Sequence, residues 1–247
     1  MARPADRVAE RRVPLSKERV LRTAMAIADQ GGIDSLSMRR LAQELGVEAM
    51  SLYHYVSSKD DILNGIVEIV VAEIEVPSGG KDWRAAVRSS AISFHDALAR
   101  HRWAANLIMS GIGVGTARVR YMEALLGRLR EAGFSANMTH HAYHALDSHI
   151  MGSTLWAAGY SALAKADPGA VQRFVQKLPV ADYPYFAEHV DQHLTKSARD
   201  GVSEFEFGLD LILDGLEKVR SATSPRSSTR RTDRPIRRSR RPTRRPS

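Results

Sequence analysis

The side chains with the clearest capacity for recognition chemistry lie between Ser37 and Lys59, on both sides of a short glycine-containing stretch. Small side chains let a helix approach base edges closely, and hydroxyl, imidazole and cationic groups can donate to bases or to phosphate oxygens. This combination predicts contact with double-stranded DNA. The residues predicted to make that contact are Arg39, Ala49, Met50, Ser51, Tyr53, His54, Tyr55 and Lys59.

Two short helices joined by a turn are expected to position these residues. Ser37 is a good N-cap, apolar residues recur at helical spacing up to Leu45, and Gly46 ends the first helix. A second helix is predicted from Ala49 to Val56. Such a pair is typical of a helix-turn-helix, whose second helix enters the DNA major groove. The alternative is an ordinary helical hairpin whose aromatic residues belong to the core.

The overall composition excludes several classes of protein. With 247 residues, of which 43% are apolar and 26% charged, the chain can bury a substantial core. It contains neither a run of 18 apolar residues nor an apolar signal segment, so we expect a cytoplasmic protein with no membrane partner. The absence of cysteine excludes disulfides, thiolate nucleophiles and cysteine-ligated zinc.

Positive charge is concentrated at the two ends of the chain. Residues 221–247 carry ten arginines and one acid, so the other 220 residues hold a net charge of −1 out of a total of +8. This Arg/Pro/Ser-rich tail is predicted to be disordered because it has few apolar residues to offset its ordering entropy. It either strengthens non-specific phosphate binding or has no dedicated role. The basic arm of residues 1–14 is also predicted to be disordered.

Between these ends the pattern is helical, which predicts an all-α fold. We expect a three-helix DNA-binding head over residues 15–62 and a larger helical ligand-binding and dimerisation domain over residues 63–220. A connecting helix starts after Ser58 and links the two. The helices predicted after it span about residues 82–100, 103–111, 116–132, 136–160, 168–178, 182–195 and 203–220, separated by glycine and proline.

The stretch RLAQELGVEAMSLYHYVSSKDDIL resembles the DNA-binding segment of the tetracycline-repressor (TetR) family, with its pattern LA..LGV....LY.H...K..L. WRAAVRSSAISFHDALARHR, LREAGFS and FEFGLDLILDGLEKV are similar to later segments of the same family, so the likeness covers about residues 15–220. The resemblance implies a ligand-responsive transcriptional regulator, most often a repressor, and not an enzyme. It also implies a homodimer, joined by helices 136–160 and 203–220, on a near-palindromic operator. A small-molecule effector would move the heads through the connecting helix.

An apolar cavity with a few polar points is expected to hold the effector. The residues predicted to line it are Ser90, Phe94, Trp103, Met109, Ile112, Tyr121, Leu125, His149, Met151 and Trp156. The alternative is that these residues are simply core. In the tetracycline-binding members of the family, His, Thr and Glu side chains hold a magnesium-chelated drug, and those positions fall here on Ile108, Gly111 and Trp156. Because none of these can chelate, the resemblance implies an effector with more apolar surface.

Other chemistry finds little support in the sequence. His140 and His144 are four residues apart on one helical face, a spacing that can bind metal, but no HExxH glutamate accompanies them. We therefore predict polar or interfacial histidines, no metal site and no cofactor. No Gly-x-Ser-x-Gly nucleophile motif is present either. Two further functions stay open, namely non-specific binding of DNA or anionic polymers through the tail, and small-molecule binding without an operator.

Overall fold

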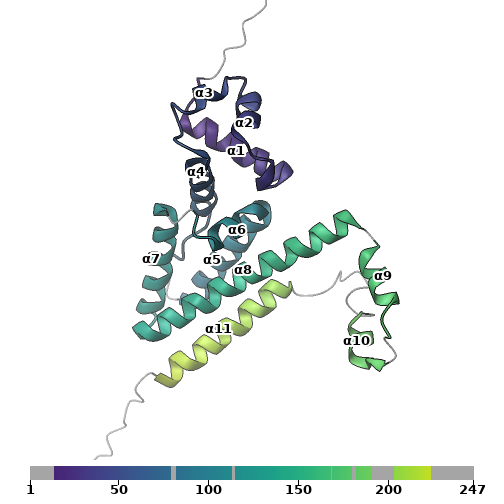
Figure 1. The fold of residues 1–247 in the computed structure, drawn as a ribbon. Helices are drawn as coiled ribbons and strands as arrows, with labels where there is room; N and C mark the ends of the chain where they lie inside the picture. The colour runs from purple at the N-terminus through teal and green to yellow at the C-terminus, as the bar shows by residue number, and fades with distance from the viewer. Residues whose placement is uncertain are drawn as a thin grey trace, which may run out of the picture.

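The computed structural model describes residues 14–78, 82–112, 115–167, 169–179, 182–190 and 203–223, and the regular elements in these ranges are helices (Figure 1). They are α1 (Lys17–Gly31), the 3₁₀ helix η1 (Ile33–Ser35), α2 (Met38–Leu45), α3 (Ala49–Leu52), α4 (Lys59–Ala72), α5 (Trp83–Arg100), α6 (Arg102–Met109), α7 (Thr116–Glu131), α8 (Ala136–Ala166), α9 (Ala170–Gln176), α10 (Pro184–His189) and α11 (Glu204–Thr223). The all-α prediction is confirmed. Apart from residues 14 and 221–223, the predicted arm and tail lie outside the described residues.

A small head of α1 to α3 is joined by α4 to a larger helical body (Figure 1). Helix α4 starts in the head and packs in the body against α5, α6 and α7. The long helices α8 and α11 lie side by side along one face of the body, and α9 and α10 lie beyond the C-terminal end of α8 (Figure 1). Within the described ranges, no helix combines the length and apolar character needed to span a membrane.

The helix ends of the head follow the predicted capping pattern. The hydroxyl oxygens of Ser16, Ser37 and Ser58 each accept a hydrogen bond from the backbone amide three residues later, at 3.2, 3.2 and 3.1 Å. Gly46 adopts a left-handed conformation, with φ of 68°, and ends α2. Because a β-carbon is unfavourable in that conformation, glycine makes the tight turn between α2 and α3 possible.

Several predicted helix ends are wrong. Helix α3 ends at Leu52 and not at Val56, because Tyr53 and Tyr55 donate their amides three residues back and close turns. Helix α8 continues past residue 160 to Ala166, since the isolated Gly159 costs a helix only about 1 kcal/mol. Helix α10 begins at Pro184 and not at residue 182, its predicted end lies outside the described residues, and α11 extends three residues into the segment predicted as tail.

A continuous set of buried apolar side chains runs from the head through α4 into the body. Helix α4 is buried on a broad face, as the sequence predicts for a helix with two partners. Its buried residues are Ile62, Leu63, Ile66, Val67, Val70 and Val71. The predicted domain division between residues 62 and 63 therefore falls inside one continuous helix.

Polar contacts join α5 to α11 within the body. Arg88 Nε donates to Asp210 Oδ1 at 2.8 Å, and Trp83 Nε1 donates to Glu217 Oε2 at 3.1 Å. The guanidinium of Arg220, with smaller contributions from the hydroxyl of Ser221 and from Trp83, lowers the pKa of Glu217 from 4.5 to about 2. The ionised form of Glu217 therefore stabilises the fold.

The substitution Glu217→Gln tests this contribution through its pH dependence. Because the folded-state pKa is lowered, the stabilisation is complete above about pH 4.5 and is lost as the pH falls towards about 2. The Glu217 side chain is 36% exposed, so we expect a difference in unfolding free energy of about 1 kcal/mol or less at neutral pH. Urea unfolding of both proteins at a series of pH values should show that difference shrinking in acid. A difference that stays constant down to pH 2 would contradict the assignment.

Candidate DNA-binding and effector sites

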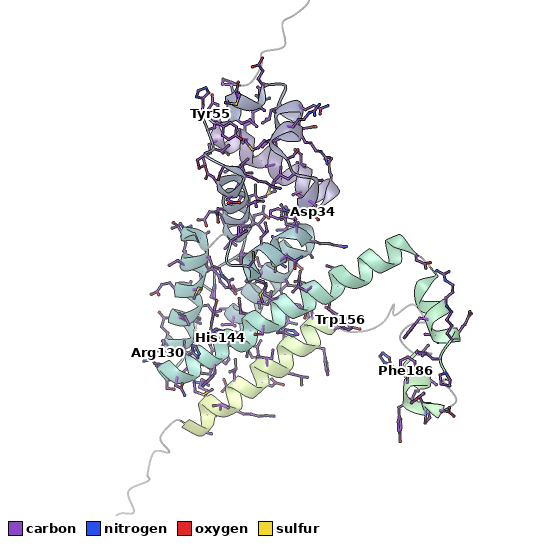
Figure 2. The ribbon with its side chains drawn as sticks, viewed as in Figure 1. Asp34, Tyr55, Arg130, His144, Trp156 and Phe186 are labelled. Carbon is purple, nitrogen blue, oxygen red and sulfur yellow. The ribbon has the colours of Figure 1, made fainter. Side chains whose placement is uncertain are left out.

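The residues predicted to contact DNA lie on the head, and most of them are open to solvent. Met50 is 71% exposed, Tyr53 48% and Tyr55 37%, and Arg39, His54 and Lys59 are also exposed. Figure 2 shows Tyr55 at the end of the head that points away from the body. Large exposed apolar and aromatic side chains on one small domain are typical of a contact surface.

Buried residues of the same segment hold this surface in place. Leu52 and Val56 are fully or almost fully buried, and Val47 is half-buried after donating its amide to Ala42 O at 3.0 Å. With one side of α3 fixed against the core, Met50 projects outwards. Ala49 and Ser51 are half-buried, so they offer less surface to DNA than the prediction assumed.

The predicted effector residues divide into buried and exposed groups. Ser90, Phe94, Trp103, Tyr121, Leu125 and Met151 are buried, whereas Ile112 and His149 are half-buried. Met109 and Trp156 are 63% and 66% exposed, so neither lines an interior cavity of the single chain. Trp156 projects from α8 (Figure 2).

Two hollows on the surface lie away from the predicted effector residues. One of about 550 Å³ lies on the head between α1 and α2, and one of about 320 Å³ lies between Pro77 and α7. None of the ten predicted effector residues lines either of them. The buried members of the predicted set therefore lie outside these two hollows.

Phe94 and Tyr121 form the centre of that packed set. Their rings meet edge to face with centroids 5.1 Å apart. The Tyr121 hydroxyl bonds to Ser90, whose own hydroxyl donates to the backbone oxygen of Glu75 at 2.6 Å. Burial raises the pKa of Tyr121 well above its ordinary value, so its phenol stays neutral. The structure thus brings together three of the predicted effector residues.

Sequence reasoning missed an arginine at the same place. Arg118 is 8% exposed, and its Nη2 donates to Asp147 Oδ1 at 2.6 Å and to the Tyr143 hydroxyl at 3.1 Å. Burial alone would lower the pKa of Arg118, but Asp147 raises it above its ordinary value and keeps the group charged. The sequence did contain a signal for it. Arg118 falls in the first turn of the predicted helix 116–132, where a cation interacts unfavourably with the helix dipole, so its presence there is unusual.

A second missed cluster joins the head to the body. Asp29, near the end of α1, accepts hydrogen bonds at the same oxygen from His101 Nδ1 at 2.8 Å and from Trp103 Nε1 at 2.7 Å. Nε2 of His101 lies 3.6 Å from Glu73 Oε2, at the end of α4. Trp103, predicted to line the effector cavity, instead donates to the head.

Three histidines of α8 were candidates for effector or metal binding. His149 Nε2 lies 2.8 Å from the backbone oxygen of Phe205 and joins α8 to α11, so its imidazole is engaged there. The rings of His140 and His144 lie 4.5 Å apart on an exposed part of α8. Among the residues described, no three histidine, aspartate or glutamate side chains gather as metal ligands would. The histidine pair therefore has no third protein ligand in this part of the chain.

Two descriptions of protein families match this chain. The family described as "Bacterial regulatory proteins, tetR family" matches residues 20–66, and "Tetracyclin repressor-like, C-terminal domain" matches residues 76–220. The class A tetracycline repressor from transposon 1721 of Escherichia coli is 31% identical over 86% of this chain and 97% of its own length.

Solved structures of ActR from Streptomyces coelicolor share the fold. Apo ActR is similar with a TM-score of 0.69 and 28% identity, over 85% of this chain and 98% of that one. ActR in complex with actinorhodin gives a TM-score of 0.67 and 27% identity, over 84% and 99% of the two chains.

The contact between head and body can be tested with Asp29→Ala. The substitution leaves the N–H groups of His101 and Trp103 without their shared acceptor, so we expect the free energy of unfolding to fall by about 1–3 kcal/mol. Urea unfolding followed by circular dichroism measures the change. Asp34→Ala, at an exposed carboxylate of the same head, is the matched control and should be nearly neutral. Equal effects of the two variants would mean that the Asp29 contact contributes nothing.

Proposed function

The chain belongs to the TetR family of ligand-responsive, DNA-binding repressors, and we propose that it binds a near-palindromic operator as a homodimer and is released by a small, largely apolar effector. The head would read DNA through the surface around Met50, Tyr53 and Tyr55. The curated relatives are transcriptional regulators, which supports a regulatory and not an enzymatic role. We place the protein in the cytoplasm, where its DNA target would be.

The observation that carries the proposal is the position of α4. This helix begins at Lys59, within the predicted DNA-contact surface, and ends at Ala72 inside the body. A displacement of its body end is therefore transmitted to the head. An effector that favours one tilt of α4 changes DNA affinity only by the difference between its affinities for the two states.

A small-molecule effector is supported by a relative and by the composition of the site. ActR has been crystallised with actinorhodin. In this chain the interior of the body contains Phe94, Tyr121 and Met151, whose side chains suit an apolar ring system. At the positions where the resemblance places the tetracycline–magnesium ligands, Ile108 and Gly111 among them, this chain has no chelating side chain.

A dimer is supported by the face that α8 and α11 share. Phe207 and Leu211 on α11 are 60% and 57% exposed, and Trp156 on the adjacent α8 is 66% exposed. Large apolar side chains gathered on two neighbouring helices favour burial against a second copy. Two-fold symmetry would present two recognition surfaces about 34 Å apart, one turn of DNA.

Selection from random duplex DNA tests operator recognition. Full-length protein is incubated with the library in moderate salt, with excess genomic DNA as a competitor for non-specific sites. We expect enrichment of a near-palindrome because two identical heads read two half-sites. If no sequence is enriched and binding to any DNA falls steeply with salt, the arginine-rich tail is responsible and the operator proposal is wrong.

The substitution Leu211→Glu tests the proposed dimer. A charge buried at an interface without a partner costs several kcal/mol, so the variant should sediment as a monomer where the natural chain is a dimer. Val119→Glu, at a 56% exposed position on α7, is the matched control and should leave the dimer intact. A variant at Leu211 that sediments as the natural chain does would exclude α11 from the interface.

A further inference from the structure

We infer that Asp61 is a positioning residue for DNA binding, whose carboxylate holds residues 53–58, the segment between α3 and α4, in the conformation that presents Tyr53, His54 and Tyr55 to DNA. This role rests on the proposed function, because it concerns the same surface of the head. It extends that function by assigning a part in DNA binding to an acidic residue whose own charge DNA repels.

The segment 53–58 carries three of the predicted DNA contacts between two helices. Helix α3 ends at Leu52, and α4 begins at Lys59. The amides of Tyr55 and Val56 donate to Leu52 O at 2.9 and 3.0 Å, and Val56 is buried, so the first part of the segment is tied to α3 and to the core. The two serines that follow are exposed, and a few hydrogen-bonded residues do not hold one conformation by themselves. The end of the segment therefore needs another anchor.

Asp61, in the first turn of α4, provides that anchor. Its Oδ2 accepts a hydrogen bond from the amide of Ser57 at 3.0 Å and lies 3.4 Å from the Ser57 hydroxyl. Its own amide donates to Ser58 Oγ at 3.1 Å. Serine and acid thus form a variant of the capping box, in which the acid bonds to the residue before the cap. These bonds fix the end of the segment relative to α4.

A third contact brings α1 to the same carboxylate. Nζ of Lys17, the first residue of α1, donates to Asp61 Oδ1 at 3.0 Å. The hydrogen bond from the Ser57 amide, followed by that from Lys17, lowers the pKa of Asp61, so the carboxylate stays ionised. One side chain therefore joins α1, the segment and the start of α4. The head can then carry its DNA-contact residues as one unit when α4 moves.

The charge of Asp61 gives its proposed role a measurable sign. DNA presents closely spaced phosphates, so an acidic side chain beside the contact surface opposes binding. If Asp61 acted only through its charge, its removal would strengthen binding. If it positions the segment, its removal weakens binding, because the complex then has to order residues 53–58. Asp60 carries the same charge in the same helical turn, is exposed and lies outside these contacts.

Three single variants of the full-length protein separate these effects. Their dissociation constants for the selected operator are measured by fluorescence anisotropy, at a temperature where circular dichroism shows every variant to be folded. We expect Asp61→Ala to bind about tenfold more weakly than the natural chain, the factor that one charge-assisted hydrogen bond gives. Asp61→Asn keeps an acceptor for the Ser57 amide and should recover most of that loss. Asp60→Ala, the matched control, should bind at least as tightly as the natural chain.

Hydrogen exchange of the free protein measures the positioning without DNA. The amides of residues 53–58 should exchange about tenfold faster in Asp61→Ala, because the bond that closes the segment is lost, and at the natural rate in Asp60→Ala. The inference is overturned if Asp61→Ala binds the operator as tightly as Asp60→Ala does, or if its exchange in this segment is unchanged. A loss in Asp61→Asn as large as in Asp61→Ala would also overturn it, since the acceptor would then not be the group that matters.

Failure of the proposed function gives a different result. If the natural chain enriches no DNA sequence, operator recognition is wrong, and the exchange measurement still decides whether Asp61 holds the segment. If an operator is enriched and Asp61→Ala binds it as the natural chain does, operator recognition stands and the role of Asp61 is wrong.

Discussion

Helix α4 is buried against two partners along its length, and the arrangement of the molecule depends on this double burial. Ile62 and Leu63 lie in the part of the helix nearest the head, whereas Val70 and Val71 lie towards its end in the body. Apolar contacts of this kind are strong but non-directional, since their free energy follows the area removed from water and not the angle between helices. Burial alone would therefore join head and body without fixing how they are oriented.

Directional contacts supply that orientation at two places. On the head, Asp29 accepts from His101 and Trp103, which belong to the body. On the body, the Glu68 carboxylate of α4 accepts from the first turn of α7. Each contact breaks with a small displacement, because hydrogen bonds weaken steeply with distance and angle. The apolar packing between head and body thus tolerates movement, whereas the polar contacts define one orientation of the head relative to the body.

The features that the sequence predicted are those that local chemistry determines. Serine caps, the left-handed glycine between α2 and α3 and apolar periodicity depend on residues within one or two turns, so Ser37 and Gly46 could be read directly. Pairing partners distant in sequence could not. Trp103 was expected in the effector cavity because it is large and apolar, yet its N–H bonds to Asp29, 74 residues away. Apolar patterning predicts burial, but it does not identify the partner of a buried polar group.

The closed packing around Phe94 constrains how an effector can act. Phe94 is fully buried, and Arg118 beside it is 8% exposed, so an effector at the proposed site would have to displace packed side chains. Such displacement would change the packing of α5, α7 and α8 against one another. The same helices hold α4 through Glu68 and through the bond from Ser90 to the backbone of Glu75. Opening the interior and holding α4 in its present position are therefore competing requirements, which gives the effector the difference in affinity that regulation needs.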